Sequence, residues 1–183
     1  TATRSCTVSS WRLRGGQRLQ ATDIAVPADF SSAAFFLVAA SIVPGSELRL
    51  RAVGLNPRRT GLLQASRMMG ADIVEEHPST HGGEPVADLV VRHAPLHGIE
   101  VPEALVPDMI DEFPALFIAA AHASGATVVR GAGELRVKES DRLAAMANGL
   151  RTLGLQVDET PDGATLPPGE LQSGVGEGHG GHR

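Results

Sequence analysis

A run of charged residues from Arg136 to Arg142, here called the charged heptapeptide, is the part of the chain best suited to chemistry. Five of its seven side chains are ionisable, and an apolar pattern of helical spacing follows it. In a helix over 139–153, Glu139 and Arg142 share one face, and Lys138 lies one turn before Arg142. Free N–H groups at a helix start also favour anions. The pattern predicts a carboxylate between two cations, able to move a proton beside an anionic substrate; the alternative is a solvated helix start with local ion pairs.

A second acidic cluster, from Asp108 to Glu112, precedes the most apolar stretch of the chain, residues 115–123. A carboxylate at the mouth of a buried helix is partly desolvated, which raises its pKa toward that of a useful general base. Helix capping is the alternative, because Asp29 and Asp111 each stand just before an apolar helical pattern.

Two further segments carry cations. His179 and His182 lie among glycines beside Arg183, but no Cys or acidic cluster completes a metal ligand set, so we expect no metal. An Arg beside a flexible turn is better suited to hold a carboxylate or phosphate through two parallel hydrogen bonds. The segment 56–61 contains two Arg residues and no acid, so we expect it at most to position a ligand or a helix.

Composition and absent motifs exclude several classes of function. The net charge is −5 with dispersed basic residues and 3% aromatics, which argues against a nucleic-acid partner. No apolar run is long enough to span a membrane. Cys6 is the single cysteine, which fits a reducing, cytoplasmic setting. There is no nucleophile-elbow, Walker or dinucleotide-binding pattern, so we expect no cofactor. We also expect a monomer.

An internal repeat must position these groups. The first copy is predicted as helix, strand, helix, strand and a further strand, at residues 31–43, 47–53, 60–69, 71–75 and 87–92. The second is predicted as helix, strand, helix and strand, at residues 113–123, 126–130, 139–153 and 155–158. The first helix of each copy is apolar nearly all round and should be buried, whereas the second helices are amphipathic. Residues 77–85 read as an exposed hairpin connection, and residues 1–27 fall outside the repeat.

The charged heptapeptide, with Ile110-Asp111-Glu112-Phe113-Pro114 upstream, resembles the 5-enolpyruvylshikimate-3-phosphate synthase family. The stretches 27–36 and 55–61 and the ending His179 to Arg183 are similar to the same family, although Gly181 stands where the family usually has Asp. The resemblance covers nearly the whole chain. It implies an α/β fold of repeated βαβαββ units with buried helices and outer sheets. Residues 1–27 would be the end of the N-terminal domain and the hinge, and 28–183 an incomplete C-terminal domain with two units and the start of a third.

The resemblance also implies a reaction: transfer of the enolpyruvyl group of phosphoenolpyruvate to the 5-hydroxyl of shikimate 3-phosphate, with release of phosphate. Asp111 would be the base for that hydroxyl. Glu139, aided by Lys138, would exchange a proton with the methylene carbon, and Lys138 would also contact shikimate 3-phosphate. Arg142 and Arg183, next to His182, would hold phosphoenolpyruvate.

We expect this chain alone to be inactive, because most of the N-terminal domain is absent from it. Two alternatives stay open: a UDP-N-acetylglucosamine enolpyruvyl transferase, and a non-catalytic relic. The first usually relies on a loop Cys, for which Cys6 is badly placed.

Overall fold

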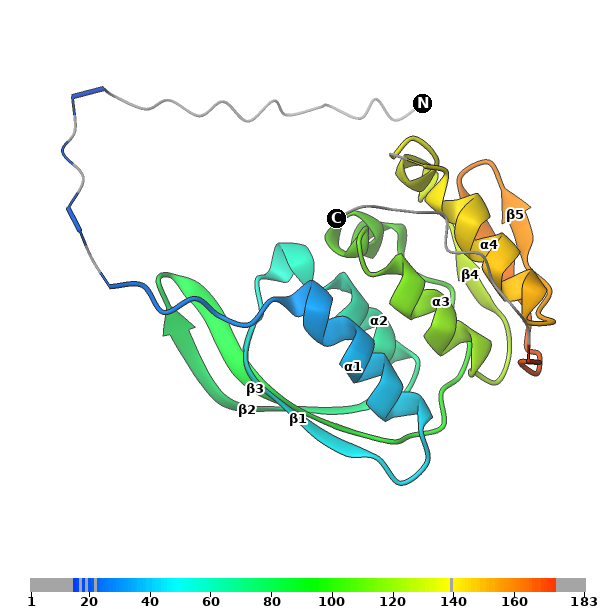
Figure 1. The fold of residues 1–183 in the computed structure, drawn as a ribbon, viewed down its shortest axis with the longest axis horizontal. Coiled ribbons are helices and arrows are strands. Elements are labelled where there is room, and N and C mark those ends of the chain that lie inside the picture. The colour runs from blue at the N-terminus through cyan, green and yellow to red at the C-terminus, as the bar shows by residue number, and fades with distance from the viewer. Residues whose placement is uncertain (1–14, 17, 19, 22, 139, 174–183) are drawn as a thin grey trace, which may run out of the picture.

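Two α/β units of the same topology follow one another along the chain (Figure 1). The computed structural model describes residues 15, 16, 18, 20, 21, 23–138 and 140–173. The first unit consists of α1 (Phe30–Ile42), β1 (Glu47–Gly54), the 3-10 helix η1 (Pro57–Arg59), α2 (Gly61–Met68), β2 (Asp72–His81) and β3 (Glu84–Arg92). After the 3-10 helix η2 (Glu103–Met109), the second unit consists of α3 (Phe113–Ala121), β4 (Thr127–Val129), η3 (Gly133–Arg136), α4 (Arg142–Thr152), β5 (Asp158–Thr160) and β6 (Gly163–Leu166).

The sheets of the two units share one strand order. In each antiparallel sheet the last strand lies in the centre, giving β1-β3-β2 and β4-β6-β5. Each unit is also preceded by a short parallel bridge to its first strand, from Ala28 to Val53 and from Glu100 to Val128. After that bridge each unit runs helix–strand–helix–strand–strand, close to the βαβαββ order that the family resemblance implies. The repeat inferred from the sequence is present in the fold.

Some predicted boundaries in the second unit were wrong. The predicted helix over 139–153 begins at Arg142, because the Asp141 side chain caps the N–H of Ala144 at 2.9 Å. The predicted strand over 155–158 begins only at Asp158, because the preceding residues form a loop whose apolar side chains are buried. The short strand β6 was not predicted at all; its four residues are too few to show an alternating pattern.

In the first unit the helices and strands lie close to their predicted positions. Within the connection 77–85, however, β2 continues to His81 and β3 starts at Glu84, which leaves a tight turn at Gly82 and Gly83. Both glycines have positive φ angles, which a reversal of this kind requires.

Helix α3 lies at the centre of the molecule. It contacts α1 and α2 of the first unit and β6 of the second, and the helices gather on one side of the first sheet (Figure 1). Its side chains Phe113 and Phe117 are fully buried and meet edge to face. Both helices bury most of their residues, as predicted, although α1 leaves Phe35 and Phe36 exposed. Their first residues are therefore held next to each other. None of the described helices has the length and apolarity to cross a membrane.

The outer face of the first sheet contains a strained pair of bulges around Asp88 in β3. The register shifts on both neighbouring strands there, and Ala52 and His77 each adopt a φ of 51°. The Asp88 carboxylate accepts the N–H of Ala52 at 2.8 Å and lies 3.4 Å from the His77 ring. Left-handed backbone at a non-glycine residue costs free energy. The contacts of Asp88 with Ala52 and His77 offset part of this cost and so stabilise both bulges.

Candidate active site

The starts of α3 and α4 meet at an ion pair between Asp111 and Arg142. An Arg142 guanidinium nitrogen donates to Asp111 Oδ1 at 2.9 Å. The Asp111 side chain is 52% exposed and that of Arg142 is 29% exposed, so both stay accessible to a ligand. The structure thus brings together two residues that the sequence analysis assigned to the site from separate motifs.

The charged heptapeptide divides into residues that build the fold and residues that face outward. Arg136 donates to Asp141 at 2.8 Å and to Glu159 at 3.2 Å, and also to the carbonyl oxygens of Pro161 and Thr160. The hydrogen bond to Asp141 raises the pKa of Arg136. These contacts tie the start of α4 to the β5–β6 hairpin, a structural role that the sequence analysis had not given to Arg136.

Asp141 is the cap of α4. The N–H of Ala144 is the main cause that lowers the pKa of its carboxyl, with a further contribution from Arg136. With Asp141 used as a cap and Arg136 as an anchor, Arg142 is the first residue of the helix. This local structure places the Arg142 guanidinium toward α3.

Lys138 lies before α4 rather than on it, so the predicted one-turn spacing to Arg142 does not hold. Its ammonium group forms an ion pair with Glu134 in η3. Glu139, which sequence analysis placed between the two cations, lies outside the described residues. The same is true of His182 and Arg183.

Asp111 does not cap α3, contrary to the capping alternative. The cap position is occupied by Glu112, which makes no capping side-chain hydrogen bond. Pro114, the second residue of α3, has no N–H to donate to a cap. Asp29, directly before α1, caps that helix as predicted by accepting the N–H and the hydroxyl of Ser32, both at 2.9 Å, and the residue in its place before α3 is Glu112.

Glu112 is the desolvated acid of this region. Its side chain points inward, the residue is only 4% exposed, and it accepts a hydrogen bond from the Ser31 hydroxyl at the start of α1. Burial raises the pKa of the Glu112 carboxyl against the effect of the Ser31 hydrogen bond, and the charge of Asp111 raises it further. The desolvated carboxylate expected within 108–112 is therefore Glu112, which anchors the start of α3 to α1.

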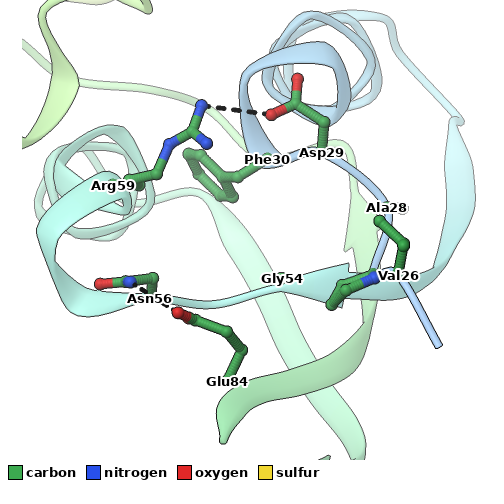
Figure 2. Close-up of a pocket in the computed structure, with 9 residues that line it drawn as sticks. Val26, Ala28, Asp29, Phe30, Gly54, Asn56, Arg59 and Glu84 are labelled. Carbon is green, nitrogen blue, oxygen red and sulfur yellow. Dashed lines mark hydrogen bonds and ion pairs between the residues drawn. The ribbon is translucent and has the colours of Figure 1, made fainter. Parts of the chain in front are cut away.

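Arg59 connects the first unit to this anchor. Its guanidinium donates to Asp29 at 3.2 Å and to the Ser31 hydroxyl at 3.1 Å. Partial burial raises the pKa of Asp29, but the hydrogen bonds from Ser32 and the charge of Arg59 together lower it by more. The pKa of Asp29 is therefore below its ordinary value. Figure 2 shows Arg59 and Asp29 reaching toward each other across Phe30, at the edge of a pocket of about 300 Å³.

A smaller pocket of about 90 Å³ lies where η1, η2 and the starts of α1 and α3 converge. It is lined by Ser31, Arg58, Arg59, Pro107, Asp108, Ile110, Asp111 and Glu112. Arg58 lies 3.4 Å from Asp108. Gly61 permits the convergence, because a Cβ at that position would lie 2.7 Å from the carbonyl oxygen of Leu105. Asp111, an accessible carboxylate on a pocket lined by two guanidinium groups and paired with Arg142, suits proton transfer beside an anionic ligand.

The sequence analysis missed Ser31 as a link between the two helix starts. The available signal was the polar Ser31 itself, near the start of an otherwise apolar helical pattern. Within the described part of the chain, no group of three or more His, Cys, Asp or Glu side chains is arranged to hold a metal ion.

Comparisons with known proteins cover nearly the whole chain. A family model described as EPSP synthase (3-phosphoshikimate 1-carboxyvinyltransferase) matches residues 3–183. The 3-phosphoshikimate 1-carboxyvinyltransferase of Xanthomonas axonopodis pv. citri is 80% identical over 172 residues, which are 94% of this chain and 39% of that protein. The protein of the same name from Xanthomonas oryzae pv. oryzae is 79% identical over 174 residues, 95% of this chain and 40% of that protein. The chain thus spans about two fifths of the length of these relatives.

Solved structures agree with the sequence comparison. An EPSP synthase from Acinetobacter baumannii is similar with a TM-score of 0.81 and 51% identity, over 84% of this chain and 35% of that one. The enolpyruvyl transferase NikO from Streptomyces tendae is similar with a TM-score of 0.55 over 78% of this chain and 30% of that one. At 18% identity, the likeness to NikO shows the fold alone.

Proposed function

Because the chain belongs to the EPSP synthase (3-phosphoshikimate 1-carboxyvinyltransferase) family, we propose that the full-length protein carrying it is an enolpyruvyl transferase. It would transfer the enolpyruvyl group of phosphoenolpyruvate to the 5-hydroxyl of shikimate 3-phosphate and release phosphate. The observation that carries this proposal is the ion pair between Asp111 and Arg142, which joins a base and a cation at an accessible place.

The chemistry requires both kinds of group. An alcohol must lose its proton while it attacks the carbon that bears the phosphate, and the neighbouring methylene carbon must gain a proton. Phosphate then leaves that carbon while the methyl group gives a proton back, which restores the carbon–carbon double bond. Asp111 is the proposed base, and Glu139 with Lys138 the proposed partner for the methylene carbon. Arg142 and Arg183, with His182 beside it, are the proposed contacts to phosphoenolpyruvate, and Lys138 is also the proposed contact to shikimate 3-phosphate. Fixed cations supply the field that stabilises negative charge as it develops.

The division of the chain into domains follows the same proposal. Residues 1–27 would end the N-terminal domain and form the hinge, and residues 28–183 would belong to the C-terminal domain with two units and the start of a third. The support is that the first unit begins at Ala28, where the parallel bridge to Val53 forms. Since the chain spans about two fifths of its relatives, we expect it to release no phosphate on its own.

The test is a chimera in which this chain replaces the corresponding segment of the Xanthomonas axonopodis relative, to which it is 80% identical. We expect the chimera to release phosphate from phosphoenolpyruvate with shikimate 3-phosphate and not with UDP-N-acetylglucosamine. We expect Asp111→Asn and Glu139→Gln each to abolish this turnover. Turnover with the UDP sugar instead would identify the other transferase, and no turnover with either acceptor would favour a non-catalytic relic.

A further inference from the structure

The two units use the residue directly before their first helix differently. Asp29 caps α1 by accepting the N–H of Ser32. The residue in its place before α3 is Glu112, whose longer side chain makes no capping hydrogen bond. It accepts instead the hydroxyl of Ser31 at the start of α1, and both residues are buried. The cap position of the second unit therefore links the two helix starts.

Arg59 fixes the direction of this link. Its guanidinium donates to the Ser31 hydroxyl oxygen at 3.1 Å and to Asp29 at 3.2 Å. A serine hydroxyl has a single hydrogen to donate, and a guanidinium group cannot accept it. That hydrogen is therefore directed to the Glu112 carboxylate. A hydrogen bond to a buried carboxylate is strong, and its loss leaves a desolvated acceptor without a partner.

Asp111 lies on a short turn whose two ends are buried. Met109, at the end of η2, is fully buried, and its carbonyl oxygen accepts the N–H of Glu112 at 3.0 Å. Between these two anchors the Asp111 side chain stays half exposed and pairs with Arg142. Because Glu112 follows Asp111 directly in the chain, a shift of Glu112 moves the backbone that carries the Asp111 carboxylate.

We infer that Ser31 and Glu112 are positioning residues that together hold the carboxylate of Asp111 in place. This inference rests on the proposed function, in which Asp111 takes the proton of the attacking hydroxyl. A misplacement of about 1 Å in a reacting group can lower a rate about 100-fold. Ser31, which belongs to the first unit, thus acts on the base of the second unit through Glu112.

The cation of the site is placed by other contacts. Arg142 begins α4, which is capped by Asp141 and tied to the β5–β6 hairpin through Arg136. Losing the link between Ser31 and Glu112 should therefore slow the reaction without weakening the proposed contact to phosphoenolpyruvate. This separation of kcat from KM distinguishes a positioning role from a contact to substrate.

The experiment compares kcat, KM and Tm of the chimera with those of two Glu112 variants. Glu112→Met keeps a long side chain without an acceptor oxygen, whereas Glu112→Gln keeps an oxygen that can accept from Ser31. We expect Glu112→Met to lower kcat about three- to tenfold, with a Tm that stays the same or rises because no charge is buried. Glu112→Gln should keep kcat within about twofold. KM for phosphoenolpyruvate should change by less than about twofold in both variants.

Two serines of α1 provide a matched control. Ser31→Ala removes the donor to Glu112, so we expect kcat to fall about three- to tenfold. Ser41 is also buried, but its hydroxyl donates to the carbonyl oxygen of Leu37 within the same helix, at 2.9 Å. Ser41→Ala should therefore keep the kcat of the unsubstituted chimera. Ser31→Ala combined with Glu112→Met should lose no more than the larger single loss, because both remove the same bond.

The outcomes separate this inference from the proposed function. No turnover by the unsubstituted chimera, or full turnover after Asp111→Asn, would overturn the proposed role of Asp111 and this inference with it. If Asp111→Asn is inactive but Glu112→Met keeps the kcat of the unsubstituted chimera, only the inference fails. Equal losses of kcat in Glu112→Met and Glu112→Gln, or additive losses in the double variant, would also overturn it.

Discussion

The first unit and the second unit each place an Asp–Arg ion pair beside the start of their first helix and build it differently. Arg59 reaches Asp29 before α1, and Arg142 reaches Asp111 before α3. In the first pair the carboxylate is also a helix cap, so its charge is already stabilised by a hydrogen bond from the backbone. In the second pair the carboxylate is uncapped, and its neighbour Glu112 secures the helix start. Duplication of a unit supplies one pair that supports a helix start and leaves the other available for the proposed chemistry.

Removing the cation from each pair should give the largest difference between the units. Arg142→Ala deprives the site of the proposed contact to phosphoenolpyruvate, so we expect kcat/KM of the chimera to fall about 100-fold or more. Arg59→Ala removes contacts to Asp29 and Ser31 that support helix starts, so its loss of kcat/KM should stay below about tenfold. Steady-state phosphate release measures both. Equal losses would mean that the two pairs are not functionally distinct.

The two carboxylates with shifted pKa values should respond oppositely to pH. Folding lowers the pKa of Asp29, so its contribution to stability is full above its unfolded pKa of about 3.9 and is lost as the pH falls through the folded value. Folding raises the pKa of Glu112, so its contribution is full below its unfolded pKa of about 4.3 and is lost as the pH rises through the folded value. At neutral pH the buried Glu112 carboxylate therefore costs stability.

Glu112→Gln tests this sign, because Gln can still accept the Ser31 hydrogen bond but carries no charge. We expect the Tm of the variant to equal or exceed that of the unsubstituted chimera at pH 7, and the advantage to shrink as the pH falls to about 4. Thermal unfolding from pH 4 to 8 measures it. An advantage that grows on acidification would contradict the assignment of Glu112 as a desolvated acid.

The smallest effect is expected in the first sheet, at the bulge beside Asp88. Ala52 has a φ of 51°, a conformation that costs an L-residue about 1–2 kcal/mol. Ala52→Gly relieves this cost but adds about 0.5–1 kcal/mol of chain entropy. We expect a net gain of about 0.5 kcal/mol in the free energy of unfolding by urea. Ala94→Gly, where φ is not positive, should lower it instead, and a loss at Ala52 would show that the bulge is not strained.

Much of the fold could be predicted because the hydrophobic residues of each repeat recur with the spacing of helices and strands. The apolar α1 and α3 and the strands β1 and β3 lie where their patterns predict. The second unit departs where a local bond overrides the pattern: Asp141 caps Ala144, which delays α4 until Arg142. The apolar residues before β5 are buried in a loop, so their hydrophobicity indicated burial and not a strand.

The sequence named candidate members of the site but not the contacts between them. Motif order pointed to Asp111 and Arg142, but no spacing rule places residues from two helix starts at 2.9 Å. The roles of Ser31 and Glu112 arise from the packing of α1 against α3, which the sequence of either helix alone does not reveal. Arg136 belongs to the charged heptapeptide, but its four contacts show that it supports the start of α4.

The central claim is that the Asp111–Arg142 pair serves catalysis and the Asp29–Arg59 pair serves stability. The most direct test is to compare the kcat of the chimera after Asp111→Asn and after Asp29→Asn. Asn can cap a helix as well as Asp can, so Asp29→Asn keeps the cap and loses only the charge. We predict that Asp111→Asn lowers kcat about 1,000-fold or more, whereas Asp29→Asn lowers it less than about tenfold. Losses of the same size, or a larger loss at Asp29, would contradict the assignment of the catalytic base to the second unit.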